Sequence, residues 1–248
     1  MPFWNFKNSK ENEEEIELRI DGDIAMDDDF WSMLFGIENV TPNGFMAELA
    51  QYKGKDINVW INSYGGDVYA ASRIYTALKE HKGKVKVKID GVAISAASVI
   101  AMAGDEILMS PTSILMIHNP WGNFQGEAKD LRHGADVLDE VKETIINAYQ
   151  LKTGKSRAKI SKMMDEETWM SAKKAVAEGF VDAMLYVENK EEEPIENSFM
   201  FSRSAIQNSV NNRTRDFIKQ YNQRFKETYK DEEKIKLLKS KLALECEL

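Results

Sequence analysis

The chain has 248 residues, of which 43% are hydrophobic, 30% charged and 10% aromatic. This composition suits one α/β domain with an appendage and excludes disordered, fibrous and low-complexity proteins. The formal charge of −8 has the wrong sign for a protein that covers nucleic acid with a basic face.

Membrane insertion and secretion are also disfavoured by the sequence. The uncharged stretch over residues 91–104, which is rich in small residues, is too short to span a bilayer. The N-terminus lacks the basic start, apolar core and cleavage site of a secretory signal. We therefore expect a cytoplasmic protein that has neither a membrane nor a nucleic acid as a partner.

The N-terminal segment, residues 1–15, is predicted to be a polar leader because charged and polar side chains fill residues 7–15. Residues 16–21 alternate between apolar and polar side chains, which predicts a half-buried strand. Residues 22–31 are predicted to form a loop. It contains three consecutive aspartates, but these lack the further oxygen ligands at defined spacing that a metal site needs.

The middle of the chain predicts repeated strand–helix units. In chain order we expect a helix over 41–49, a strand over 56–62 followed by Gly65-Gly66, a helix over 68–81, a strand over 85–90 that Gly91 ends, a helix over 92–103 and a strand over 114–118. Strands that alternate with helices favour stacked β–α units with largely parallel pairing.

The remaining elements follow this repeat. A long amphipathic helix is predicted over 127–152, then a capped helix over 171–179 and a last strand over 180–187. Residues 188–202 are predicted to be an acidic linker, and residues 203–248 a charged helical tail. The tail carries 11 Lys/Arg against 7 Asp/Glu, a net charge of +4, whereas residues 1–202 carry 22 against 34, a net charge of −12.

Cofactor chemistry has no obvious residues in this sequence. The sequence contains neither of the glycine-rich loops that bind nucleotide phosphates, Gly-x-x-x-x-Gly-Lys-Ser/Thr and Gly-x-Gly-x-x-Gly, and no His-Glu-x-x-His motif of a zinc site. Cys246, the single cysteine, excludes an internal disulfide and a cysteine-rich zinc site. We therefore expect no cofactor and no metal.

Nucleophilic chemistry is the alternative, and its components are present. Ser95 follows a strand and stands where a helix is expected to begin, although it and Ser98 are also typical of a tightly packed helix. His118 lies at the end of an apolar strand, a common position for a reactive group, although a buried structural histidine has the same pattern. The paired glycines 65 and 66 suit either a turn or the close approach of backbone N–H groups to a ligand.

Four motifs in order resemble the Clp protease proteolytic subunit family, whose fold is shared with crotonases. They are Ile61-Asn-Ser-Tyr-Gly-Gly-Asp-Val, Gly91-Val-Ala-Ile-Ser-Ala-Ala-Ser, Leu115-Met-Ile-His-Asn-Pro-Trp-Gly and Glu167-Thr-Trp-Met-Ser-Ala followed by Ala-Glu-Gly-Phe-Val-Asp. The resemblance covers residues 16–187 and is closest to the phage and prophage members described as head maturation proteases.

The resemblance implies a role for each matching residue. Ser95 is then the nucleophile and His118 the general base, and the backbone N–H groups of Gly66 and Ala96 form the oxyanion hole. The third residue of the family's catalytic triad is an aspartate, and the aligned position in this chain holds Glu167. Asp165, two residues earlier, is the rival for this role.

The resemblance also implies a fold and partners. We expect an α/β spiral in which residues 127–152 are a handle helix, and homo-oligomeric rings of seven subunits that enclose the active sites and take protein or peptide substrates. Three functions are consistent with it: an endopeptidase that processes phage capsid or scaffold protein, a degradative subunit fed by a Clp ATPase, or a catalytically silent assembly factor. Residues 1–15 and 21–38 depart from the sequence pattern of housekeeping members of the family, so the question of a Clp ATPase partner stays open.

Overall fold

The computed structural model describes residues 4–8, 15–24 and 42–187 of the chain. The acidic linker expected over 188–202 and the helical tail expected over 203–248 lie outside the described residues. So do the three consecutive aspartates at 27–29.

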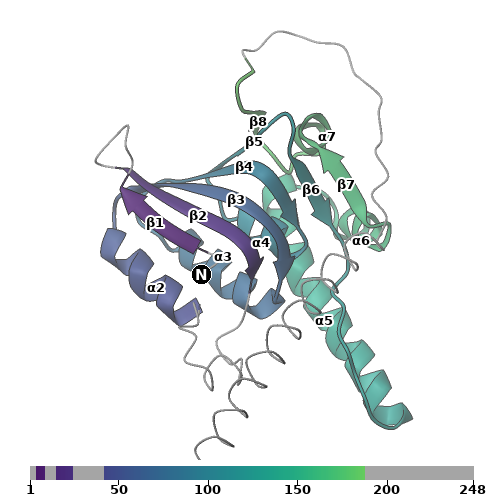
Figure 1. Ribbon diagram of the computed structural model, residues 1–248. Helices are drawn as coiled ribbons and strands as arrows, with labels where there is room; N and C mark the ends of the chain where they lie inside the picture. The colour runs from purple at the N-terminus through teal and green to yellow at the C-terminus, as the bar shows by residue number, and fades with distance from the viewer. Residues whose placement is uncertain (1–3, 9–14, 25–41, 188–248) are drawn as a thin grey trace, which may run out of the picture. The chain divides into compact units, whose positions relative to one another are not determined.

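The strands of the described residues form one eight-stranded sheet (Figure 1). They are β1 (Trp4–Asn8), β2 (Glu15–Ile24), β3 (Asp56–Gly66), β4 (Val85–Ile94), β5 (Glu106–Met109), β6 (Ile114–Ile117), β7 (Thr168–Ser171) and β8 (Ala183–Met184). The order is β1-β2-β3-β4-β5-β8, and β6 pairs with β4 and with β7. All of these pairs are parallel except β1 with β2 and β6 with β7, which confirms the α/β class and the largely parallel pairing.

Helices α2, α3 and α4 cover one face of this sheet (Figure 1). The helical elements are α2 (Pro42–Leu49), η1 (Ala50–Tyr52), α3 (Val68–Lys79), α4 (Ala96–Ala101), α5 (Ala128–Thr153), α6 (Arg157–Asp165) and α7 (Ala172–Ala177). The core lies between the two layers, where Ile57, Val59 and Ile61 of β3 are buried together with Ile74 and Leu78 of α3. None of the helices within the described ranges combines the length and the apolar character that a bilayer span requires.

The long helix α5 has two different halves. Its predicted apolar stripe is buried in the second half, at Val141, Ile145 and Tyr149. In the first half the same stripe faces solvent, and 48% of Leu131 is exposed. The second half therefore anchors the helix to the core, while the first half leaves apolar surface open.

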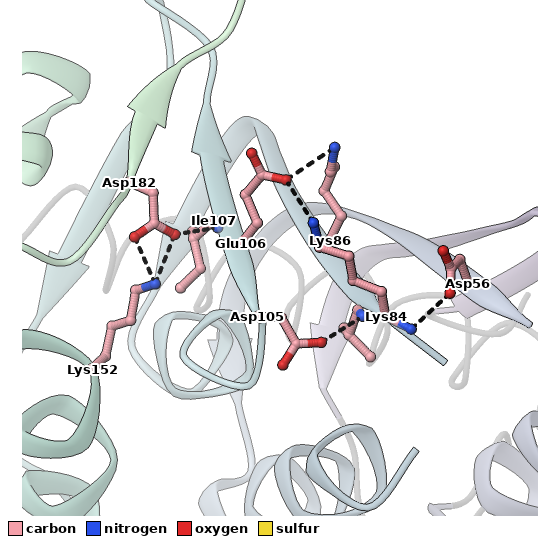
Figure 2. A network of polar contacts seen from close by, with 9 residues as sticks. Asp56, Lys84, Lys86, Asp105, Glu106, Ile107, Lys152 and Asp182 are labelled. Carbon is pink, nitrogen blue, oxygen red and sulfur yellow. Dashed lines mark hydrogen bonds and ion pairs between the residues drawn. The ribbon is translucent and has the colours of Figure 1, made fainter. Parts of the chain in front are cut away.

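Aspartates fix the starts of the parallel strands (Figure 2). Asp105 accepts a hydrogen bond from Val85 N through its carboxylate (2.8 Å) and donates its own N–H to Val85 O (2.8 Å). Asp182 makes the same exchange with Ile107 and also binds Lys152 Nζ. Each aspartate thus satisfies backbone groups that the sheet ladder leaves unpaired at a strand end.

Two sequence predictions near the sheet were wrong. Residues 4–8 were expected in the polar leader, but they form an edge strand because Trp4 and Phe6 alternate with polar residues and pack against Phe45. Gly91 was expected to end a strand and residues 92–94 to be helical. Instead β4 continues to Ile94, because its edge changes partner from β5 to β6 beside Gly91.

Besides β1 and the short η1, three elements were missed altogether, namely β5, α6 and β7. The two strands have only four residues each, too few for a clear alternation of side chains. The last strand, expected over 180–187, is limited to the two residues of β8. The predicted loop at Gly22 begins later, since β2 continues to Ile24 across a register shift.

Candidate active site

Ser95 stands at the junction of β4 and α4, at the carboxyl end of a central strand. It occupies the N-cap position of α4 with φ 58° and ψ −126°, a positive φ that is uncommon for a residue with a side chain. Its N–H donates to the carbonyl of Met116 in β6 (3.0 Å). The strand that carries Ser95 is thereby joined to the strand that leads to His118.

His118 lies directly after β6, and its Nε2 is 2.7 Å from Ser95 Oγ. This separation is a hydrogen bond, in the range expected for a nucleophile and its base. The other histidines lie elsewhere: His81 Nε2 binds the carbonyl of Lys55 (2.7 Å), and His133 is exposed on α5.

The glycine pair at the end of β3 packs against the Ser95 junction. A Cβ at Gly65 would lie 2.8 Å from Ser95 Cβ and 3.0 Å from the Ala96 nitrogen, so only glycine allows this approach. Gly66 has φ +142° and pairs with Ile24 of β2. The glycine backbone, Ser95 and the Ala96 nitrogen therefore converge in one small volume.

Glu167 and Asp165 occupy different surroundings. Ile117 of β6 pairs with Thr168 of antiparallel β7, so His118 directly follows and Glu167 directly precedes the last pair of this ladder. Glu167 has φ 50° and its Oε1 accepts a hydrogen bond from the Trp169 indole (3.3 Å).

Asp165 forms a polar cluster that the sequence analysis did not anticipate. Its Oδ1 accepts from Lys142 Nζ (2.6 Å) and from Asn119 Nδ2 (2.9 Å). The bond from Lys142, and after it the bond from Asn119, holds the pKa of Asp165 below its ordinary value. These partners come from α5 and from the segment after β6, so sequence spacing gave no signal of them.

The arrangement can activate a hydroxyl group. A base lies within hydrogen-bond distance of Ser95 Oγ, and the Gly65 backbone packs closely against Ser95 and the Ala96 nitrogen. The positive end of α4 adds little because the helix has only six residues. The chemistry that fits is acyl transfer through a serine.

Comparison with known proteins agrees with this chemistry. The family model described as Clp protease matches residues 38–188. The ATP-dependent Clp protease proteolytic subunit of Porphyromonas gingivalis is 34% identical over 155 residues, which is 60% of this chain and 70% of that protein. The proteins of the same name from Bacteroides fragilis and Deinococcus radiodurans are 34% and 30% identical over 155 residues, covering 75% and 76% of their lengths.

Proposed function

The chain belongs to the Clp protease family and is a serine-type peptidase, and we propose that Ser95, His118 and Glu167 are the residues with which it hydrolyses peptide bonds. The observation that carries this proposal is the 2.7 Å separation of Ser95 Oγ and His118 Nε2. Glu167 and His118 each adjoin the Ile117–Thr168 pair of β6 and β7, and this proximity supports the role of Glu167 as the group that orients the imidazole.

The reaction follows from these positions. Ser95 Oγ attacks the substrate carbonyl while His118 Nε2 accepts its proton, and the N–H groups of Gly66 and Ala96 bind the oxyanion. The C–N bond then breaks as His118 returns the proton to the leaving amine. Water attacks the resulting ester by the reverse sequence, with His118 again as base, and releases the acid and free Ser95.

A serine-reactive fluorophosphonate tests these assignments. Mass spectrometry of wild-type protein is expected to show one adduct on Ser95, and Ser95→Ala and His118→Ala are expected to show none. His133→Ala, which changes an exposed histidine of α5, is the matched control and should react as wild type. An adduct on Ser95→Ala would overturn the nucleophile assignment, and no adduct on any folded sample would favour the silent assembly factor.

We propose rings as the working assembly, since the curated relatives are proteolytic subunits of a larger protease. Apolar side chains exposed before and along the first half of α5 support a contact between copies: Trp121, Phe124 and Leu131. Native mass spectrometry on the labelled samples tests this proposal. A monomer at micromolar concentration would contradict it.

For the biological role we propose processing of phage or prophage capsid or scaffold protein. The family match ends at residue 188, so the basic segment over residues 203–248 lies outside it, and we propose that this segment binds such partners. The proposal predicts that a capsid or scaffold precursor of the same phage or prophage is cleaved without ATP. A cytoplasmic location remains a prediction from the sequence.

The second candidate role is degradation of unfolded chains with a Clp ATPase, which the names of the relatives favour. The two roles differ in a direct assay. Degradation of casein only after addition of a Clp ATPase and ATP would favour the degradative subunit, whereas ATP-independent cleavage of the capsid precursor would favour processing.

A further inference from the structure

Two buried hydroxyl groups lie behind Ser95, and the proposed reaction does not use them. Ser98 Oγ donates to the Ser95 carbonyl (2.6 Å) and also lies 2.8 Å from the Tyr149 hydroxyl. Ser98 and Tyr149 are both fully buried. Because the single hydroxyl proton of Ser98 is directed at Ser95, the Tyr149 hydroxyl is the donor of the second bond.

These bonds form a relay from α5 to the backbone of Ser95. Tyr149 belongs to the buried second half of α5 and its ring packs edge-on against Phe180, with centroids 5.6 Å apart. Burial raises the pKa of the Tyr149 phenol well above its ordinary value, so the hydroxyl keeps its proton in the working range of pH. The relay is therefore a fixed neutral donor at the end of a rigid helix.

The relay ends on a backbone that needs support. Ser95 holds a positive φ of 58°, a conformation that persists only where the surroundings fix it. Its N–H binds Met116 O (3.0 Å), and its carbonyl accepts both the N–H (2.9 Å) and the hydroxyl of Ser98. Relaxation of this carbonyl would rotate the Ser95 backbone and move Oγ away from His118.

We infer that Tyr149 and Ser98 are positioning residues that hold Ser95 in the conformation that aims its Oγ at His118. This inference rests on the proposed role of Ser95 as the nucleophile. Neither hydroxyl touches the substrate or the reacting atoms in this arrangement. Their effect is on the rate of acylation, because a nucleophile displaced by a fraction of an ångström attacks more slowly.

A purely structural role makes a different prediction. If the two hydroxyls only satisfy each other inside the core, their removal lowers thermal stability and leaves kcat per active site unchanged. If they position Ser95, kcat and the rate of fluorophosphonate acylation fall together while KM stays constant.

The experiment compares Tyr149→Phe, Ser98→Ala and the double variant with wild type. Tyr149→Phe keeps the aromatic ring, so its packing on Phe180 is preserved. Ser113→Ala is the matched control, because Ser113 is also buried and its hydroxyl makes the same bond to the carbonyl three residues earlier (2.7 Å), away from Ser95. A peptide that wild type cleaves, active-site titration with a fluorophosphonate, and thermal unfolding give kcat, KM and stability for each variant.

Tyr149→Phe is expected to lower kcat and the acylation rate about 5- to 10-fold, the factor that corresponds to one hydrogen bond. Ser98→Ala is expected to lower them at least as much, and Tyr149→Phe should have no further effect on kcat when Ser98 is already alanine. Ser113→Ala should keep wild-type kcat per titrated site whatever its stability.

Three results are decisive. Wild-type kcat and acylation rate in folded Tyr149→Phe would overturn the positioning role, as would additive losses in the double variant. If Ser98→Ala does not fold, Tyr149→Phe alone decides. An adduct on Ser95→Ala would instead mean that the proposed nucleophile is wrong, which separates that failure from a failure of the positioning role.

Discussion

Replacing Gly66 by alanine adds one methyl group at the residue whose N–H we assign to the oxyanion hole. A Cβ at this position would lie 2.1 Å from the carbonyl oxygen of Ile24 and 2.9 Å from its carbonyl carbon. The φ of +142° is also a conformation that residues with a side chain rarely adopt. The substitution therefore requires the backbone to move.

The direction of that movement follows from the neighbours. The Ile24 carbonyl already accepts the N–H of Asp67 (2.8 Å), and the Asp67 side chain caps α3 through Ala70 N (2.8 Å). Because β2 and the start of α3 hold this oxygen, we expect the Gly66 segment to move by about 1 Å instead. A displacement of about 1 Å at a catalytic group costs about 100-fold, and loss of one oxyanion donor costs about 100- to 1000-fold.

We therefore expect Gly66→Ala to lower the acylation rate and kcat about 100-fold or more. The control is Gly54→Ala, since Gly54 also has a positive φ (+87°) but a Cβ there would meet nothing within 4 Å. That variant is strained by about 1 kcal/mol and should retain wild-type kcat. The assay is fluorophosphonate acylation and peptide cleavage at a temperature where thermal unfolding shows both variants to be folded.

A clear result would refute the reasoning. If folded Gly66→Ala reacts within threefold of Gly54→Ala, the Gly66 N–H is not an oxyanion donor and the glycine is needed only for packing. If both variants lose activity equally, the positive φ alone explains the loss and the contact with Ile24 is irrelevant.

The remaining predictions concern carboxylates. Glu167→Gln should lower kcat far more than Asp165→Asn, and the reverse ranking would transfer the orienting role to Asp165. Asp105→Ala leaves the buried N–H of Val85 without its partner and should lower the free energy of unfolding by about 1–3 kcal/mol. Asp56→Ala is the control and should cost less, because its partner, the N–H of Lys84, is exposed. Equal losses in urea titrations would contradict this prediction. Lys142 lowers the pKa of Asp165. The stability that this ion pair contributes is therefore present above pH 4, and it is lost as the pH falls through the lowered pKa of Asp165. Wild type should therefore exceed Lys142→Met by about 1 kcal/mol or less near pH 7, and a difference that persists at pH 2 would exclude this ion pair as its cause.

The elements that the sequence predicted correctly are those with a local signal. Helix α3 has an aspartate cap and regular apolar spacing, and α5 has a long amphipathic repeat that ends at Gly154. The missed elements lack such signals, because β5 and β7 are short and gain their hydrogen bonds from distant strands. Gly91 was misread for the same reason, since the change of partner along β4 depends on strands β5 and β6.

The features of the candidate site also separate into those with a local sequence signal and those without one. Ser95, His118 and the glycine pair could be proposed from the sequence because each follows or ends a recognisable strand and matches a family motif. Three features were invisible there: the positive φ of Ser95, the pairing of Lys142 with Asp165, and the contact of Tyr149 with Ser98. The last two join residues that are 23 and 51 positions apart in the sequence.

By itself the sequence determined the chemical class and supplied the candidate residues for it, because hydroxyl, imidazole and glycine positions are encoded locally. Only the tertiary structure decided how those residues are held. The parallel sheet brings the ends of β3, β4 and β6 to one edge, and the second half of α5 packs behind α4. Hydrogen bonds and steric contacts act over a few ångströms, so the strain at Ser95 and its support exist only once distant segments meet.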